Sequence, residues 1–295
     1  MISDAELAEL EYSVGLALRS GDASRLRLLG EGEISLVLGA GATVGADPVW
    51  ACKRLPPFAT ESAADLYAVG IERYVDTLVG RGIKVLDTDV RRVSGTDGGV
   101  VLYCVQRGLP TATLAVNIAH TDRERAASLI VEIVDAALGT VDTTVGLDAQ
   151  LSNWAIIDDQ LTYFDITTPL LRGPDGTSLL DSEVFLVSMP WALRAPIRRF
   201  VLPTIIERYH DPRTVTLDLA SNLRKEGLAG LVAVVLNAVA GRIEPPLTER
   251  EVGQDRRSDA RTWATLQAVR RVDRAWQRSI RRRPYPFLLP TRSSH

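Results

Sequence analysis

The order of apolar and polar residues predicts a strand-rich first third of the chain. Apolar residues at helical spacing predict an amphipathic helix over residues 4–19. Shorter segments of alternating polarity follow it, separated by turns rich in glycine or proline. They predict strands at residues 25–29, 33–40, 49–55, 83–92 and 100–106.

A second helix is predicted over residues 61–80, between the third and fourth of these strands. Its spacing suggests that the side chains facing the core are those of Leu66, Val69, Tyr74, Val75 and Leu78.

The pattern becomes mainly helical after Gly108-Leu-Pro110. A long helical region is predicted over 111–138, with a break near 120–122, and beyond residue 180 most of the chain is expected to be helical. Between these lie two short strands, 154–157 and 161–164, joined by a turn at Asp158-Asp159. This order predicts an α+β, bilobal fold with an N-terminal lobe (1–107), a hinge at 106–110 and a C-terminal lobe (108–295).

Composition narrows the function only slightly. The chain has 295 residues, 46% of them hydrophobic, and a net charge of −3, so it should not attract nucleic acid or membranes broadly. The N-terminus does not look like a signal peptide, and the apolar segment 228–240 is too short to span a bilayer. The segment 184–206 is interrupted by prolines and arginines, so we expect irregular buried structure there. Cys52 and Cys104 lie in strand-like segments, which favours buried thiols and a cytoplasmic location.

The most informative motif is formed by Asp148, Asn153 and Asp165. An Asp, an Asn five residues later and a second Asp after a short hairpin have the spacing of a kinase catalytic loop and its metal-binding strand. In that chemistry the first Asp orients and deprotonates a hydroxyl, while the Asn and the second Asp hold Mg²⁺. The simpler interpretation is a polar loop that turns the chain before a strand.

Two upstream features support the kinase-like interpretation. Gly30, Gly32 and Ser35 lie between two predicted strands, as in a glycine-rich phosphate loop, although an ordinary hairpin turn has the same appearance. Lys53 follows on the next strand, where a lysine would contact nucleotide phosphates. Glu72, in the middle of the helix that follows, is its expected ion-pair partner, with Glu61 and Asp65 as alternatives. An exposed strand lysine and a solvated helix face are the simpler alternatives.

Other chemistries find little support. The three histidines do not cluster with Cys or acidic residues, so no transition-metal site is expected, and no G-x-S-x-G nucleophile motif occurs. Arginines recur between residues 270 and 283, and a solvated helix face is favoured there over a nucleic-acid or peptide surface.

Taken together, these residues resemble the protein-kinase-like superfamily in its small-molecule branch, similar to aminoglycoside phosphotransferases and choline-kinase-type enzymes. The resemblance implies ATP and Mg²⁺ as cofactors and Asp148 as the catalytic base. It implies Mg²⁺ ligation by Asn153 and Asp165, and a Lys53–Glu72 ion pair at the phosphates. It also implies that the adenine binds the hinge backbone within 105–108, which includes Val105 and Arg107.

The sequence departs from this superfamily at two positions. Gly146 stands where the family usually has a His, two residues before the catalytic Asp, and Ile166 follows Asp165 where protein kinases have Phe. No Ala-Pro-Glu segment occurs, which argues against a regulated protein kinase.

The main hypothesis is therefore a phosphotransferase acting on a hydroxyl of a small molecule, a natural product or a peptide Ser/Thr. A non-catalytic nucleotide- or peptide-binding module that serves a partner enzyme, and an enzyme that transfers AMP, stay open as alternatives. The acceptor, the choice between ATP and GTP, and the oligomeric state are also open. Polar residues in the C-terminal region, among them Asp181 and Asp218, are candidates for the acceptor site, although Asp181 is equally suited to capping the segment after it.

Overall fold

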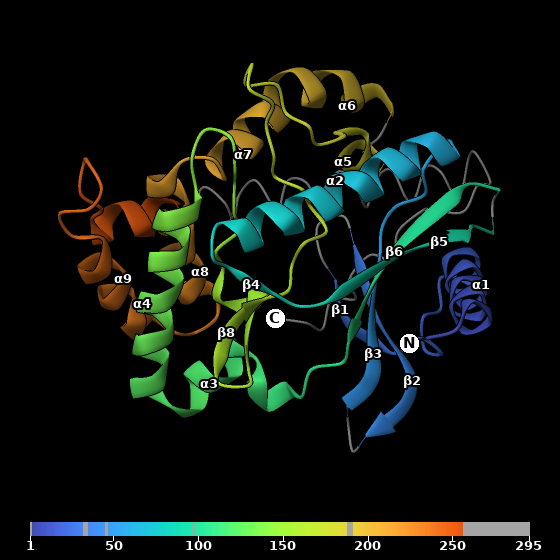
Figure 1. Ribbon diagram of the computed structural model, residues 1–295, viewed down its shortest axis with the longest axis horizontal. Coiled ribbons are helices and arrows are strands. Elements are labelled where there is room, and N and C mark those ends of the chain that lie inside the picture. The colour runs from blue at the N-terminus through green and yellow to red at the C-terminus, as the bar shows by residue number, and fades with distance from the viewer. Residues whose placement is uncertain (1, 32–34, 45–46, 97, 188–190, 256–295) are drawn as a thin grey trace.

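The computed structural model describes residues 2–31, 35–44, 47–96, 98–187 and 191–255. The chain is α+β, with a β-rich N-terminal region and a helical C-terminal region (Figure 1). The predicted arginine-rich helix at 270–283 lies outside the described residues.

The N-terminal region is built on a five-stranded antiparallel sheet with the order β1-β2-β3-β6-β5. Its strands are β1 Leu28–Glu31, β2 Leu36–Val44, β3 Asp47–Arg54, β5 Thr88–Ser94 and β6 Val100–Arg107. The central pairing of β3 with β6 sets Lys53 opposite Cys104. Consequently Lys53 and Cys104 share one face of the sheet and Arg54 and Tyr103 share the other.

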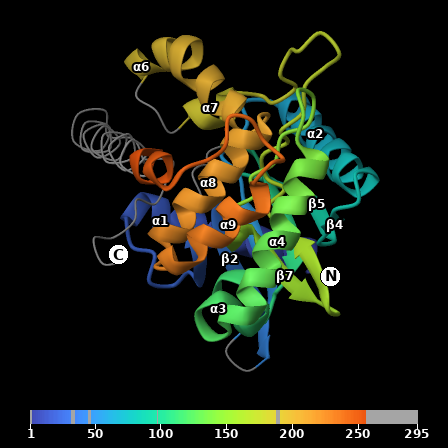
Figure 2. The ribbon, with the colours of Figure 1, turned by 90° about the vertical axis from the view of Figure 1, so that its left-hand side faces the viewer.

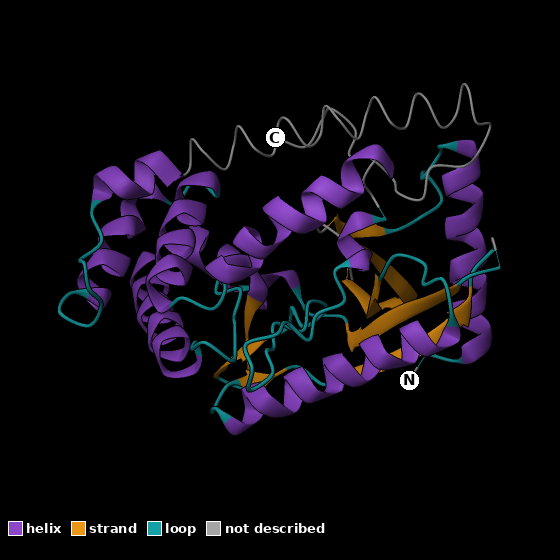
Figure 3. Ribbon diagram, turned by 90° about the horizontal axis from the view of Figure 1, so that it is seen from above, coloured by secondary structure: helices purple, strands orange, loops and turns teal. Residues whose placement is uncertain are grey.

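Helix α1, Asp4–Ser20, covers the second of these faces (Figure 3). Ser3 starts the helix with a reciprocal pair of hydrogen bonds to Glu6, and Leu7, Val14 and Leu18 pack on the sheet. Glu11 is buried in this interface and binds the Arg54 guanidinium through two bonds of 2.7 and 2.8 Å. The Tyr103 hydroxyl donates a further hydrogen bond of 2.7 Å to Glu11.

Helix α2, Glu61–Gly80, has the predicted bounds but not the predicted face. Tyr74 and Leu78 are buried as expected, whereas Leu66 and Val69 are 72% and 58% exposed, so their inward placement was wrong. The buried face is instead formed by Ala64, Tyr67, Ile71, Tyr74 and Leu78. Tyr67 and Tyr74 can be buried on this face because the hydroxyl of each donates a hydrogen bond to a backbone carbonyl.

Part of the segment predicted as the fourth strand leaves the main sheet. Residues 83–92 form two strands, of which the first, β4 Lys84–Val85, pairs in parallel with β8. The antiparallel hairpin of β7 Trp154–Ile157 and β8 Gln160–Tyr163 turns at Asp158 and Asp159, as predicted. Both Asp residues have positive φ angles, 50° and 59°, which such a tight turn requires.

The helices of the C-terminal region pack together (Figure 2), and the core that they share includes Leu147 and Leu151 from the loop that carries Asp148. The predicted long helix is broken at Asp122, which caps α4 through the Arg125 amide. The helices are α3 Ala115–Thr121, α4 Arg123–Thr140, α5 Glu183–Leu186, α6 Trp191–Pro196, α7 Leu202–Arg208, α8 Pro212–Lys225 and α9 Val232–Val239, with a π-helix at Ile197–Val201 between α6 and α7.

The described residues of the segment 184–206 are therefore mainly helical, and Phe200 among them is 68% exposed, so the expectation of irregular buried structure was wrong for this part of the segment. None of the helices that the structure describes combines the length and the apolar character needed to cross a bilayer.

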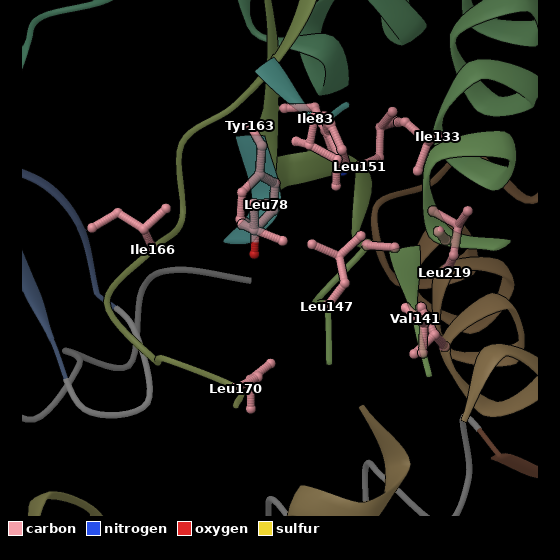
Figure 4. Packing of buried hydrophobic residues seen from close by; sticks show 14 of the residues in the cluster. Leu78, Ile83, Ile133, Val141, Leu147, Leu151, Tyr163, Ile166, Leu170 and Leu219 are labelled. Atoms are coloured by element: carbon pink, nitrogen blue, oxygen red, sulfur yellow. The ribbon is translucent and has the colours of Figure 1, made fainter. Parts of the chain in front are cut away.

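The largest hydrophobic core of the described residues contains side chains from the loop that carries Asp148 (Figure 4). Leu147 and Leu151, on either side of Asp148, are fully buried and anchor the loop in this core. Helices α2, α4 and α8 contribute Leu78, Ile133 and Leu219 to the same core. Burial of loop residues on both sides of Asp148 fixes the backbone that carries this half-buried carboxylate.

Candidate functional site

Lys53 reaches from β3 to the segment that carries Asp165. Its ammonium group donates a hydrogen bond of 2.7 Å to the Phe164 carbonyl and lies 3.3 Å from a carboxylate oxygen of Asp165. It also lies 5.0 Å from the centroid of the Phe164 ring, within cation–π range. The lysine side chain is 7% exposed, so its charge is compensated mainly by these protein groups rather than by water.

Gln106 holds the same segment from the neighbouring strand. Its side-chain amide donates to the Phe164 carbonyl at 2.9 Å and to the Thr88 hydroxyl at 2.9 Å. Sequence reasoning placed Gln106 at the hinge and gave its side chain no role. Strand alternation does place it on the face that carries Cys104 and Lys53, and this was the available signal.

The predicted metal ligands are brought together by the β7–β8 hairpin. Phe164 donates its backbone N–H to the Asn153 carbonyl at 3.1 Å, which sets Asn153 beside the residue before Asp165. The Asn153 side chain donates to the Asp148 carbonyl at 3.2 Å. The Thr167 hydroxyl donates to the Asp165 carboxylate at 3.0 Å, and this contact was also not anticipated.

Asp148 lies close to the same group of residues. Its carboxylate accepts a hydrogen bond of 3.3 Å from the backbone N–H of Gln150. The hydroxyls of Tyr74 and Tyr163 are buried nearby. Burial raises the pKa of both tyrosines, and the negative charges of Asp148 and Asp165 raise each pKa further. Asp148 and Asp165, seventeen residues apart in the sequence, therefore both lie within electrostatic range of the same two phenols.

Glu72 does not take the place expected for it. The four acidic residues of α2 (Glu61, Asp65, Glu72 and Asp76) are all exposed, and Asp65 pairs with Arg92. Within the described residues, Asp165 is the only acidic partner of Lys53 at ion-pair distance. The predicted Lys53–Glu72 ion pair is therefore not formed in the described structure. The α2 face that packs on the core is apolar and aromatic, which leaves Glu72 exposed.

The other nucleotide-binding residues are only partly described. Gly30 lies in β1 opposite Val37, and Ser35 lies in the connection to β2, whereas Gly32 is outside the described residues. The Val105 side chain packs with the α1 cluster on the far face of the sheet, and Arg107 is exposed at the end of β6. The role of these residues toward a nucleotide stays a prediction.

The donor set suits a magnesium ion better than a transition metal. Within the described part of the chain, no group of three or more His, Cys, Asp and Glu side chains could hold a metal. Magnesium, however, usually takes one or two protein carboxylates and completes its shell with water and substrate phosphates. One carboxylate from Asp165 and one amide oxygen from Asn153 fit that pattern.

Few of the candidate acceptor residues lie beside this site. Asp218 on α8 accepts a hydrogen bond of 3.3 Å from the Gln150 side chain, next to the Asp148 loop. Asp181 accepts from the Glu183 amide at 2.9 Å, as its capping alternative predicted. A cavity of about 510 Å³ lies elsewhere, lined by Arg224, Glu249, Arg250, Gly253 and Gln254.

The family of this chain follows from its sequence. Residues 21–274 match the model of a family of unknown function, DUF6206. The chain belongs to this family. No curated protein matches it.

Two solved structures have a similar arrangement at low sequence identity. A MAP kinase, LmaMPK10 from Leishmania major, is 13% identical, with a TM-score of 0.30, and the match covers 77% of this chain and 84% of the kinase chain. The GDP complex of wild-type aminoglycoside 2′-phosphotransferase-IIIa is 14% identical, with a TM-score of 0.26, and the match covers 79% of this chain and 99% of the other. Similarities at these TM-scores carry no functional conclusion for this chain.

Proposed function

We propose that this chain is an ATP- and Mg²⁺-dependent phosphotransferase that acts on a hydroxyl group of a small molecule or natural product. A Ser or Thr hydroxyl in a peptide has the same chemistry and falls within the proposal. The observation that carries it is the convergence of Lys53, Asp148, Asn153 and Asp165 from separate segments, joined by hydrogen bonds through Phe164 and the loop backbone.

Each residue has a chemical role in this proposal. Asp148 orients the acceptor hydroxyl and takes up its proton, while Asn153 and Asp165 hold Mg²⁺ against the nucleotide phosphates. Lys53 neutralises phosphate charge. In the described structure its ammonium group rests against Asp165, so metal binding at that carboxylate would free Lys53 for the phosphates. Phosphoryl transfer requires mainly positioning and charge neutralisation, which this set of residues can supply.

The proposal is tested by thermal unfolding with ATP, ADP and GTP, each with and without Mg²⁺. A ligand present at 100 times its Kd and bound only by the folded state adds about 2.7 kcal/mol of stability, which is a shift of several degrees in Tm. We expect a Mg²⁺-dependent shift that is lost in Asp165→Asn. Asp159→Asn is the matched control, because it makes the same change at the exposed hairpin turn and should keep the shift. Each variant is compared with its own ligand-free Tm, since Asp165 also pairs with Lys53.

A second candidate function is a non-catalytic nucleotide- or peptide-binding module. It is favoured by the exposure of Glu72, which leaves Lys53 without the glutamate partner that active kinases use. Absence of a shift with every nucleotide at millimolar concentration would refute the phosphotransferase and favour binding of a peptide. Where a shift is found, mass spectrometry of the products from an acceptor screen separates phosphoryl transfer from AMP transfer.

A further inference from the structure

The backbone just before Asp148 is held from three directions. Gly146 donates its N–H to the Leu170 carbonyl at 2.8 Å, and Leu147 donates to the Tyr209 carbonyl at 3.1 Å. The carbonyl of Gly146 accepts a hydrogen bond of 2.9 Å from the Tyr74 hydroxyl on α2. All of these contacts are within two residues of Asp148, so they fix the position of the backbone that carries its carboxylate.

No side chain fits at position 146 in this arrangement. A Cβ atom there would lie 2.9 Å from the Tyr209 carbonyl oxygen and 3.0 Å from both the His210 ring and the Leu170 Cβ. The Tyr209 oxygen belongs to the backbone and cannot rotate out of the way. The glycine is therefore required by its surroundings, and part of the space beside it is filled by the imidazole of His210.

His210 is fixed as firmly as the loop that it contacts. It is 4% exposed, in the turn between α7 and α8, and its backbone N–H donates to the Glu207 carbonyl at 3.0 Å. The ring Nδ1 lies 3.0 Å from the Ile206 carbonyl, an acceptor that assigns the proton to Nδ1. Burial lowers the pKa of His210, so the imidazole is neutral at pH 7.

Tyr74 supplies the opposite support. It is fully buried, and its hydroxyl bond to Gly146 joins α2, which follows β3 in the chain, to the loop in the C-terminal region. Its neighbour Tyr67, on the same face of α2, makes an equivalent bond of 2.9 Å to the Thr167 carbonyl, beyond Asp165. The two phenols thus connect one helix to two different segments of the site.

We propose that Tyr74 and His210 are positioning residues that brace the Asp148 loop at Gly146. Tyr74 would hold the loop from α2, and His210 would hold it from the α7–α8 turn. Together they would replace the support that Gly146, which has no side chain, cannot give. The proposal rests on the proposed function in one respect, namely that Asp148 acts on an acceptor. The bracing itself is a property of the loop and can be measured without turnover.

The experiment uses the full chain and the variants Tyr74→Phe, His210→Leu and His210→Asn. Tyr74→Phe removes one hydroxyl without changing the packing. His210→Leu fills the site without a donor, whereas His210→Asn retains one near the Ile206 carbonyl. Tyr67→Phe is the matched control, because it removes a buried hydroxyl from the same helix face.

Amide hydrogen exchange by mass spectrometry gives the decisive measurement. We expect Tyr74→Phe and His210→Leu to speed exchange at least tenfold in peptides covering 145–153, with His210→Asn closer to wild type. Tyr67→Phe should instead affect peptides covering 164–170. Unchanged exchange in 145–153 in both Tyr74→Phe and His210→Leu would overturn the proposal. If His210→Leu does not fold, Tyr74→Phe decides alone.

Turnover separates this proposal from the proposed function. If wild type releases ADP from ATP with Mg²⁺, we expect Tyr74→Phe to lower kcat about tenfold while the KM for nucleotide changes less than threefold, because Lys53, Asn153 and Asp165 are untouched. An unchanged kcat in that variant would also overturn the bracing role. If wild type binds no nucleotide, the proposed function fails, and the exchange measurement still decides whether the two residues brace the loop.

Discussion

The buried Glu11–Arg54–Tyr103 cluster behind the sheet gives the sharpest stability prediction. Glu11 and Arg54 are 1% and 6% exposed, and two hydrogen bonds join the carboxylate to the guanidinium. The substitution Glu11→Leu removes the carboxylate and leaves the Arg54 charge buried without its partner. The Tyr103 hydroxyl loses its acceptor at the same time.

The expected loss of unfolding free energy is large, because Arg54 and Tyr103 stay buried without the carboxylate that they bond. Removing one partner of a buried ion pair costs about 3–5 kcal/mol, and an unsatisfied buried hydroxyl adds about 1–3 kcal/mol. Domains of ordinary stability have about 5–15 kcal/mol in total. Replacing the whole cluster by apolar groups of similar volume avoids both penalties. The triple variant Glu11→Leu/Arg54→Met/Tyr103→Phe should therefore be more stable than either Glu11→Leu or Arg54→Met alone.

Urea unfolding with linear extrapolation measures these differences. Asp65→Asn is the control, since it breaks the ion pair between Asp65 and Arg92, whose side chains are 59% and 50% exposed, and should cost less than about 1 kcal/mol. Helix α1 can also detach locally, so hydrogen exchange in residues 4–20 is followed in parallel. The reasoning is refuted if Glu11→Leu changes neither the unfolding free energy by more than about 1 kcal/mol nor exchange in α1. A triple variant that loses as much as the single variants combined would refute it equally.

Two further predictions concern titratable groups whose pKa is raised by full or partial burial. Burial raises the pKa of Glu226 to about 7, against a smaller opposing effect of its hydrogen bond with Ser152. Its contribution to stability is therefore full below pH 4.5, where the unfolded carboxyl is still protonated, and is lost as the pH rises through about 7. Glu226→Gln should flatten the stability curve between these two pH values, and parallel curves for variant and wild type would contradict the assignment. Burial also raises the pKa of the Cys52 and Cys104 thiols to about 12, so both should resist alkylation at pH 8 in the folded protein and react once urea unfolds it. Thiol counting by mass spectrometry tests this, and rapid labelling of the folded chain would count against it.

Features set by residues close in sequence could be predicted well. Helix α2 has the expected bounds because Thr60 caps its start, and the break at Asp122 follows from a capping side chain in the same way. The turn at Asp158-Asp159 depends only on two residues that tolerate positive φ. The spacing of Asp148, Asn153 and Asp165 likewise predicted that the Asp148 loop and the hairpin after it belong to one site, and hydrogen bonds join the two in the structure.

Features set by distant partners could not be predicted. Strand β4 pairs with β8, more than seventy residues further along the chain, and no local pattern marks that partner. Nothing in the sequence around Gln106 distinguishes it from other strand residues, because its partner, the Phe164 carbonyl, is 58 residues away in the chain. Leu66 and Val69 have the right spacing for a core face of α2, but a helix with apolar residues on several sides can present more than one face.

The orientation of α2 explains why the expected glutamate contact is missing. Successive residues of a helix are about 100° apart, so Glu72 and Tyr74 point in nearly opposite directions. The rotation that buries Tyr67 and Tyr74 therefore exposes Glu72, and the two hydroxyls bond to the backbone of the Asp165 segment and of the Asp148 loop. The helix is thus joined to both segments directly, whereas a Lys53–Glu72 ion pair would have joined it to the sheet. The space around Gly146 is closed by other elements, namely the Tyr209 carbonyl, the His210 ring and Leu170, which explains why a glycine stands there. The missing glutamate contact and the missing side chain at 146 therefore each have a packing explanation, and neither by itself indicates that the site has lost its chemistry.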